Sequence, residues 1–413
     1  MRKIFPNINF VLYLIGRMVS DTGTGIQMII MPLYIIDAGG SAATVGLFSF
    51  LSLVPALCVY PFAGVLGDRL NRKTIMVATD FLSAGVILGL TVLSYNGSMS
   101  LSVLLAAQVL ISLLNGIFDP ATKGMLPQLV AQEELTRANS RVASLRGLSI
   151  LLGPVIGASL YANFGITMLF LINGVSFLLS GISEIPIRYK HVIREHEGGI
   201  AGIMTELAGG VKFILANSTI RKLCYYFLVI YALIQPVYSV ALPLFYKTRL
   251  QYADTQYGYL QSALILGMLL GSVLIGLVFG KGQDMLKPLK VGSGLLAAGM
   301  IMFSVFMFPG ILSTIGNGSI LYFVLLSGAL CLSSAAIMFV NVPVQSFIQR
   351  ETPNQYMSRV FSIVGMITRG GLPFGALIYG FILERAPIHW TVLVGALLMV
   401  FISVVFFISF ISN

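Results

Sequence analysis

Long runs of apolar residues separated by short polar connections dominate the sequence. A helix needs about 20 mostly apolar residues to cross the hydrocarbon core of a membrane. Twelve runs reach this length, at residues 9–36, 42–66, 74–95, 100–124, 141–163, 166–186, 221–246, 255–280, 286–309, 318–342, 356–382 and 388–411. Only 10% of the 413 residues are charged, whereas soluble domains carry about 25%. We therefore expect an all-α polytopic membrane protein whose first run stays in the mature chain as a span.

The Lys and Arg residues are distributed unevenly over the connections. If the N-terminus lies inside, the outer connections carry only Lys247, Arg249 and Arg385, and the inner segments carry most of the rest. Connections rich in Lys and Arg stay on the cytoplasmic side. We therefore expect a multi-pass protein of the plasma (inner) membrane with both termini in the cytoplasm. This asymmetry also accounts for the net charge of +10, so no nucleic-acid partner is expected.

The longest connection divides the chain into two halves. We expect an N-terminal six-helix bundle at 1–186, a cytoplasmic linker at 187–220 and a C-terminal six-helix bundle at 221–413. In the linker, residues 203–215 place apolar side chains on one helical face, which predicts a helix lying on the membrane surface. The halves are also similar in sequence. A proline at an inner helix end, a polar link and a helix with proline and small residues occur at 120–165 and again at 343–384. Two pseudo-symmetric six-helix bundles are typical of alternating-access transporters.

A dense group of charges, 67-GDRLNRK-73, lies between the second and third runs. With its neighbours, 64-GVLGDRLNRKTIM-76, it resembles the motif that the major facilitator superfamily carries at this place. The matching residues are Gly64, Asp68, Arg69, Arg72 and Lys73. Asn71 stands where glycine is usual, and both residue types tolerate a left-handed turn. The chain resembles this superfamily over its whole length.

Within the superfamily, the chain is most similar to the bacterial branch of macrolide-type efflux proteins and enterobactin-type exporters. The stretches 118-FDPATKGMLPQLV-130 and 206-ELAGGVKFILANSTIRKL-223 support this resemblance. Gly153, Pro154 and Gly157 in 147-GLSILLGPVIGA-158 resemble the Gly-Pro signature of drug antiporters. Ser112 stands where drug–proton antiporters often carry an arginine in the fourth span.

The resemblance implies a gating role for the charged group. Asp68 would contact the start of the eleventh span, with Arg359 nearby, and would latch the inner side closed. The alternative is that Arg72, Lys73 and their neighbours only fix the topology.

Four charged residues within the spans are candidates for ion coupling, because an ionisable group at the centre of a span costs about 3 kcal/mol. Arg17 and Asp21 lie four residues apart, so they share a helical face and can pair. Arg369 lies between glycines at the centre of the eleventh span, where it could face Asp21 or bind an anionic substrate. Asp119 ends the fourth span, and a structural pair with Lys123 is the alternative to coupling. For Arg17 and Asp21, a static pair that holds the first span is also open.

Two other acidic residues receive ordinary interpretations. Asp80 is expected to pair with the basic residues of 67–73. Glu184 ends the sixth span, where a long side chain can reach the interface at little cost.

Neutral polar residues of the first, fourth, seventh and tenth spans are candidates for a substrate cavity, because these spans line the cavity in the fold that the resemblance implies. They are Gln27, Asn115, Tyr231, Gln235 and Asn341. Hydrogen bonds between helices are an equal alternative for each. A cavity with aromatic walls and few fixed charges suits bulky amphipathic molecules.

We therefore expect a secondary transporter that exports bulky amphipathic, drug-like or macrolide-like compounds by alternating access, coupled to protons. The alternatives are a lipid or lysophospholipid flippase, an exporter of an anionic siderophore, and a non-transporting scaffold. The sequence has no Walker-type phosphate loop, so an ion gradient rather than ATP is the expected energy source. The three cysteines lie in apolar runs and no His/Cys cluster occurs, so we expect no metal, no cofactor and no enzyme activity. We expect a monomer in the bilayer.

Overall fold

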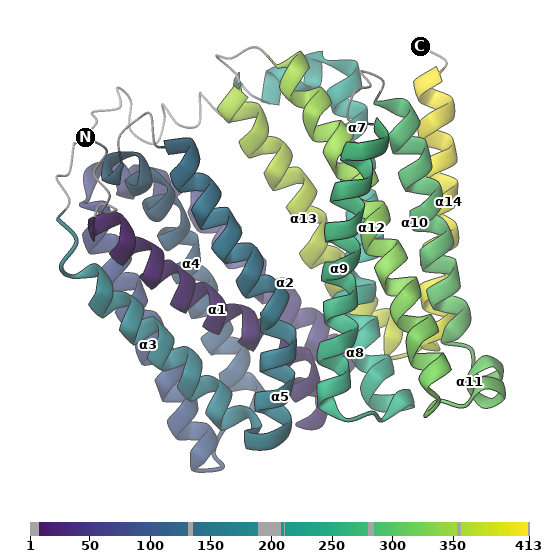
Figure 1. The fold of residues 1–413 in the computed structure, drawn as a ribbon, viewed down its shortest axis with the longest axis horizontal. Helices are drawn as coiled ribbons and strands as arrows, with labels where there is room; N and C mark the ends of the chain where they lie inside the picture. Colours follow the sequence, from purple (N-terminus) through teal and green to yellow (C-terminus); the bar gives the residue numbers. More distant parts are fainter. Residues whose placement is uncertain are drawn as a thin grey trace. The chain divides into compact units, whose positions relative to one another are not determined.

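A computed structural model describes residues 8–130, 135–188, 208–209, 211–279, 285–352 and 357–411. These residues form helices and the turns between them (Figure 1). The elements of the N-terminal half are α1 (Ile8–Asp37), α2 (Ala42–Arg69), α3 (Arg72–Tyr95), α4 (Leu101–Leu129) and α5 (Leu135–Glu184). Those of the C-terminal half are α7 (Ser218–Pro236), η2 (Val237–Ala241), α8 (Leu242–Phe245), η3 (Tyr246–Leu250), α9 (Asp254–Phe279), α10 (Leu286–Phe306), α11 (Pro309–Ile315), α12 (Ile320–Glu351), α13 (Met357–Leu383) and α14 (Ile388–Ile411).

Ten helical stretches in the described part are long and apolar enough to cross a membrane, against twelve predicted runs. α1 is not among them, and polar residues including Arg17 and Asp21 interrupt its centre. One stretch, Leu152–Glu184, continues through the fifth and sixth predicted runs. Within it, Gly165 has φ 71° and ψ −175°, a non-helical conformation that glycine adopts readily. α5 is therefore two helices joined at the predicted connection 164–165.

Side-chain caps fix the starts of several helices. Asn71, Ser100, Asn217 and Ser319 each accept a hydrogen bond from a backbone N–H in the first turn of α3, α4, α7 and α12. Such caps satisfy donors that the helix itself leaves free. Asn71, which stands where glycine is usual in the motif, is extended and not left-handed, with φ −62° and ψ 114°. Its extended backbone lets the side chain reach the N–H of Lys73 at 3.0 Å.

The seventh predicted run continues without a break from Ser218 to Leu250 but contains two π-helical turns, η2 and η3. Pro236 immediately precedes η2, and Pro243 lies between η2 and η3. Because proline has no N–H to give, α-helical hydrogen bonding is interrupted locally. The chain leaves η3 at Gln251, which is left-handed with φ 55°.

The chain divides into two compact units. Unit 1 comprises Met1–Tyr34 and Leu51–Met204, and unit 2 comprises Ile35–Phe50 and Thr205–Asn413. In unit 1, α3 packs along α5 and α4; in unit 2, α12 packs against α9 and α10, and α13 against α7 (Figure 1). A cluster of buried apolar residues in unit 1 joins α1, α3, α4 and the start of α5.

Two short segments complete the description. Residues 211–216 are helical, and Val211 and Leu215 are exposed there while Ile214 is buried. Most of the surface helix predicted at 203–215 lies outside the described residues. α11 is a one- to two-turn helix, not predicted from the sequence, in which no residue is buried.

Candidate functional site

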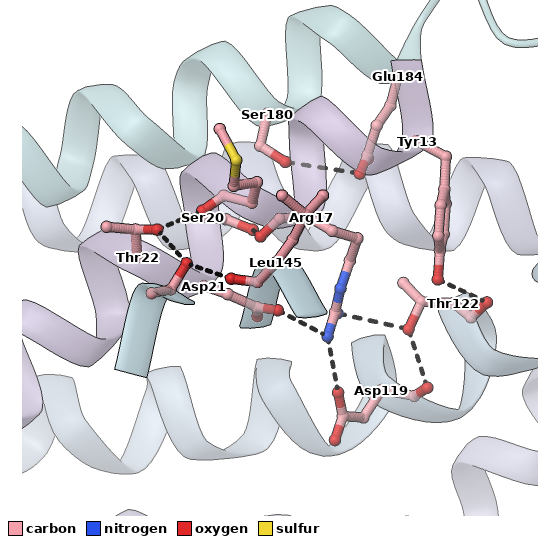
Figure 2. A network of polar contacts seen from close by, with 12 residues as sticks. Tyr13, Arg17, Ser20, Asp21, Thr22, Asp119, Thr122, Leu145, Ser180 and Glu184 are labelled. Atoms are coloured by element: carbon pink, nitrogen blue, oxygen red, sulfur yellow. Dashed lines mark hydrogen bonds and ion pairs between the residues drawn. The ribbon is translucent and has the colours of Figure 1, made fainter. Parts of the chain in front are cut away.

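Arg17 is the centre of a polar network in unit 1 (Figure 2). Its guanidinium lies 3.2 Å from the Asp21 carboxylate on α1 and 3.7 Å from the Asp119 carboxylate on α4. It also donates to the Thr122 hydroxyl at 3.5 Å and lies 4.9 Å from the centre of the Phe118 ring. Arg17 is only 7% exposed, whereas the side chains of Asp21 and Asp119 are 26% and 24% exposed. The pair predicted between Arg17 and Asp21 is thus present, and Asp119 joins it.

The turn of α4 that carries Asp119 is held by further hydrogen bonds. The Tyr60 hydroxyl of α2 donates to Asp119 at 3.4 Å. The Thr122 hydroxyl donates to the Asp119 carbonyl at 3.0 Å, and the Tyr13 hydroxyl of α1 donates to the Thr122 carbonyl at 3.4 Å (Figure 2). These bonds link α1, α2 and α4 around one cation. The Lys123 side chain, predicted as an alternative partner of Asp119, lies outside the described residues.

Small residues bring α1 close to the second half of α5. A Cβ atom on Gly16 would lie 3.2 Å from a Glu184 carboxyl oxygen, and one on Gly23 would lie 2.3 Å from the Ser176 hydroxyl. Further along α1, Gln27 accepts a hydrogen bond from Asn173 at 2.5 Å and is 4% exposed. Gln27, predicted as a cavity residue, therefore forms a contact between helices, which is the alternative weighed from the sequence.

The Gly-Pro segment in the first half of α5 also packs against α1. Gly153, Pro154 and Gly157 are buried, and a Cβ atom on Gly157 would lie 3.1 Å from the Ile26 side chain. Nearby, the Thr22 and Ser149 hydroxyls lie 2.7 Å apart. The residues that resemble an antiporter signature thus contact the helix that carries Arg17 and Asp21.

Ser112, at the position where drug–proton antiporters often carry an arginine, joins α4 to α2 by hydrogen bonds. Its hydroxyl donates to the Ser52 carbonyl at 3.0 Å and accepts from the Ala56 N–H at 3.2 Å. A Cβ atom on Gly116 would lie 2.9 Å from the Ala56 backbone. This face of α4 is closed by α2, which leaves Arg17 on α1 as the buried arginine of the described side chains in unit 1.

Two predictions about acidic residues are wrong. Glu184 is 0% exposed and lies against α1, because α1 covers the end of α5 where a reach to the interface was expected. Asp80 is 1% exposed and lies next to Phe81, which packs against Gly181 of α5, whereas Asp80 was expected to pair with the basic residues of 67–73. The Lys73 ammonium instead donates to the Ile185 carbonyl at 2.6 Å. Sequence reasoning missed these two carboxyl groups as site residues.

The C-terminal cavity candidates meet in unit 2. The Tyr231 hydroxyl of α7 donates to Asn341 of α12 at 2.7 Å. Both line a cavity of about 310 Å³ with Phe227, Gln345 and apolar residues of α7, α12 and α13. Gln235 lies one turn from Tyr231, and Asn115 is half-buried on α4 in unit 1. The cavity offers aromatic and apolar walls with two amides and a phenol for polar contacts.

The gating residues are described only in part. Gly64, Asp68 and Arg69 lie in the last turns of α2, and Arg359 and Arg369 lie in α13, but the placement of their side chains is outside the description. Arg72 and Lys73 begin α3. The predicted contact of Asp68 with the start of the eleventh span and the predicted roles of Arg369 remain predictions.

A second ion cluster lies within unit 2. The Lys247 ammonium lies 2.7 Å from the Asp37 carboxylate at the end of α1 and 2.6 Å from Asp254 at the start of α9. It therefore ties residues 35–50 to the C-terminal half of the chain. The described residues contain no group of three or more His, Cys, Asp or Glu side chains arranged to hold a metal ion.

Long apolar helices with charged groups paired in their interior indicate a polytopic membrane protein with a functional site among its helices, because such groups are retained in membranes chiefly for function. Known proteins agree with this class. The chain is 24% identical to a macrolide efflux protein A of Streptococcus pyogenes, over 93% of this chain and 92% of that protein. It is 23% identical to the multidrug efflux pump Tap of Mycolicibacterium fortuitum, over 95% and 94%.

Solved structures share the fold. The nucleoside transporter NupG superposes with a TM-score of 0.78 at 12% identity, covering 98% of this chain and 99% of that one. A bacterial homologue of the iron transporter ferroportin, in an inward-facing state, gives 0.69 at 16% identity, covering 96% and 98%. The sequence profile of the Major Facilitator Superfamily matches residues 13–375. The chain belongs to the Major Facilitator Superfamily, whose members are transporters and not enzymes.

Proposed function

We propose that this transporter exports bulky amphipathic molecules in exchange for protons. The observation that carries the proposal is the placement of Arg17 between Asp21 and Asp119, in a chain that resembles efflux proteins along more than nine-tenths of its length. Both relatives named above are efflux proteins, one for macrolides and one for multiple drugs by their names. The cavity beside Tyr231 and Asn341, with its mainly apolar lining, fits cargo of this kind.

Charge balance suggests how a proton enters the cycle. One guanidinium faces two carboxylates on different helices, and both carboxylates are partly open to solvent. Protonation of Asp21 or Asp119 removes one attraction and leaves Arg17 to the other carboxylate. The contact between α1 and α4 would then weaken or tighten with proton occupancy. Since Gly153, Pro154 and Gly157 pack near α1, a shift of α1 would reach α5 as well.

The membrane arrangement belongs to the same proposal. We count α1 as a span and divide α5 at Gly165, which brings the ten apolar stretches to twelve. The spans then form six-helix bundles at 1–186 and 221–413, joined by the linker 187–220, with both termini in the cytoplasm and the monomer as the working unit. Asp68, Arg69 and Arg359 would act at the inner gate, and Arg369 in coupling or substrate binding.

The test is proton movement in liposomes that contain the purified protein, a pH gradient and a fluorescent pH probe. Macrolides, lipophilic cations, siderophores and lysolipids are added one class at a time. We expect macrolides or lipophilic cations to release protons across the membrane through the wild type and not through Asp21→Asn. Glu384→Gln, which removes an exposed carboxylate, is the control and should behave as wild type.

Other outcomes would redirect or reject the proposal. Proton movement with siderophores or lysolipids alone would replace the cargo class. No proton movement with any class, in protein that is folded and inserted, would reject proton-coupled export.

A further inference from the structure

Asp80 and Glu184 form a buried acidic pair that the network around Arg17 does not include. Asp80 lies on α3 and is 1% exposed, and Glu184 lies at the end of α5 and is 0% exposed. One carboxyl oxygen of each, Oδ2 and Oε2, is fully buried without a hydrogen-bond partner. Neither residue forms an ion pair with the described side chains. A buried ionised carboxyl without a cation is costly, and such groups usually take up a proton instead.

The Ser180 hydroxyl contacts one of the two acids. It lies 3.5 Å from Oε1 of Glu184, one turn along α5 (Figure 2). Asp80 lies at the same level of α3, because a Cβ atom on Gly181, the neighbour of Ser180, would lie 3.2 Å from the ring of Phe81, the neighbour of Asp80. A serine hydroxyl has one hydrogen to donate, so if it is donated to Glu184, Asp80 gains no donor from it. Two buried carboxyl groups with unpartnered oxygens then favour at least one bound proton.

Among the described side chains, the nearby cation is Arg17 of α1, whose neighbour Gly16 packs against Ser180 and Glu184. The Arg17 guanidinium is paired with Asp21 of the same helix and Asp119 of α4. Tyr13 of α1 also lies near, and its hydroxyl donates to the Thr122 carbonyl. Asp80 and Glu184 are less exposed than Asp21 and Asp119, so they are less able to stay ionised.

α1 covers the pair closely. A Cβ atom on Gly16, the neighbour of Arg17, would lie 3.1 Å from the Ser180 hydroxyl and 3.2 Å from Glu184. The buried apolar cluster of Phe10, Tyr13, Met76 and neighbouring residues packs α1, α3 and α4 together in the same region. In this structure neither acid is open to water, and α1 covers Ser180 and Glu184 directly.

We propose that Asp80, Ser180 and Glu184 form a proton-binding site that holds at least one proton while α1 covers it and exchanges that proton when α1 moves. The presence of the proton does not depend on the cargo. Its use in transport rests on the exporter function proposed above, in which movement of α1 also rearranges Arg17, Asp21 and Asp119.

Infrared spectroscopy of the purified protein tests the site without any substrate. A protonated carboxyl group has a C=O stretch that an ionised one lacks. At neutral pH we expect this band in the wild type, exchanging slowly with deuterium, and still present in Asp21→Asn/Asp119→Asn. It should be lost in Asp80→Asn/Glu184→Gln. Absence of the band from the wild type, or its persistence in the Asp80/Glu184 double variant, would overturn the proposal.

A second comparison decides the matter if the double variant does not fold. Ser180→Ala removes the hydroxyl that contacts Glu184 and should shift the band, whereas Ser183→Ala, on the same turn of α5 and bonded to the Ser180 carbonyl, should not. Equal spectra for the two variants would overturn the proton site. Loss of the band on adding sodium would identify a metal-cation site instead. If liposomes show no substrate-driven proton movement while the band behaves as expected, export fails and the proton site stands.

Discussion

At the scale of single residues, Arg17 is the buried cation around which acidic side chains of unit 1 are arranged. A buried arginine is tolerated when its guanidinium finds fixed acceptors, and here it has two carboxylates and a hydroxyl on two helices. The planar group also lies over Phe118, where the ring face attracts a cation. Removing this one cation leaves several acids facing one another.

Arg17→Gln should therefore destabilise the protein strongly. Truncating one partner of a buried ion pair costs about 3 kcal/mol of unfolding free energy. Arg17→Lys keeps the charge but loses the fork that reaches both carboxylates, so it should lie between Arg17→Gln and wild type. Arg141→Gln, which removes an exposed arginine of α5, is the matched control. Unfolding of the detergent-solubilised variants, followed by circular dichroism, measures the effect; equal stability of Arg17→Gln and Arg141→Gln would contradict it.

Part of this site follows from the sequence. The spacing of Arg17 and Asp21 predicts their contact, because residues four apart share a helical face. Asp119 is about a hundred residues away, and only the packing of α4 on α1 brings it to the same guanidinium. Glu184 shows why the rest was missed. Its position at the end of a run indicates depth in the membrane, but its burial depends on the helix that covers it.

At the scale of elements, glycines set the distance between α1 and α5. Membrane helices lack a hydrophobic drive to associate in lipid and rely on close packing of small residues. Gly23 faces Ser176 and Asn173, whereas Gly25, two residues on, has no atom within 4 Å of an added Cβ. Substituting each of these two glycines therefore distinguishes the effect of close packing on stability from the effect of helix propensity.

We expect Gly23→Ala to lower the free energy of unfolding by about 1–3 kcal/mol, because the added methyl would lie 2.3 Å from the Ser176 hydroxyl and 2.5 Å from Asn173. Gly25→Ala should be neutral or slightly stabilising, since alanine favours the helix by about 1 kcal/mol. Thermal unfolding of the two variants side by side checks this. An equal loss in both would mean that close packing at Gly23 is not what holds α1.

Lys247 of η3 holds the end of α1 and the start of α9 together. Its ammonium contacts Asp37 and Asp254 together, so Lys247→Gln removes the positive charge that both carboxylates contact. Hydrogen bonds to charged groups contribute about 1.5–3 kcal/mol each, and partial exposure of Asp37 reduces the sum. We expect a loss of about 2 kcal/mol from Lys247→Gln. Asp37→Asn added to it should restore part of the loss, as measured in a double-mutant cycle; an additive cycle would argue against the shared cation.

Element positions were predictable and their irregularities were not. Hydropathy located the apolar runs within a few residues, because the thickness of the bilayer sets their length. The two π turns near Pro236 and Pro243 leave no mark on hydropathy, and the proline pattern alone does not distinguish a π turn from a kink. Asn71 is a helix cap, a role that its residue type alone does not distinguish from a left-handed turn, because asparagine is favoured in both.

At the scale of the whole molecule, the family was the firmest prediction. The motif at 64–76 indicates the superfamily from residue identities alone, and the profile match to residues 13–375 confirms it. The twelve spans remain a prediction, since ten stretches of the described residues are long and apolar enough, α1 is not among them, and Leu152–Glu184 counts as one. The polar centre of α1, which removes it from this count, also carries the candidate coupling residues Arg17 and Asp21.

Labelling of single cysteines decides the topology. In a variant without Cys58, Cys224 and Cys331, we expect a membrane-impermeant maleimide added to intact cells to label Ser98→Cys and Asn163→Cys, both exposed next to short connections. Leu70→Cys, exposed between α2 and α3, should be labelled only after the membrane is opened. If α5 crossed the membrane once, Asn163 would lie within the bilayer and stay unlabelled from both sides. Labelling of Leu70→Cys in intact cells would reverse the orientation that the Lys and Arg distribution predicts.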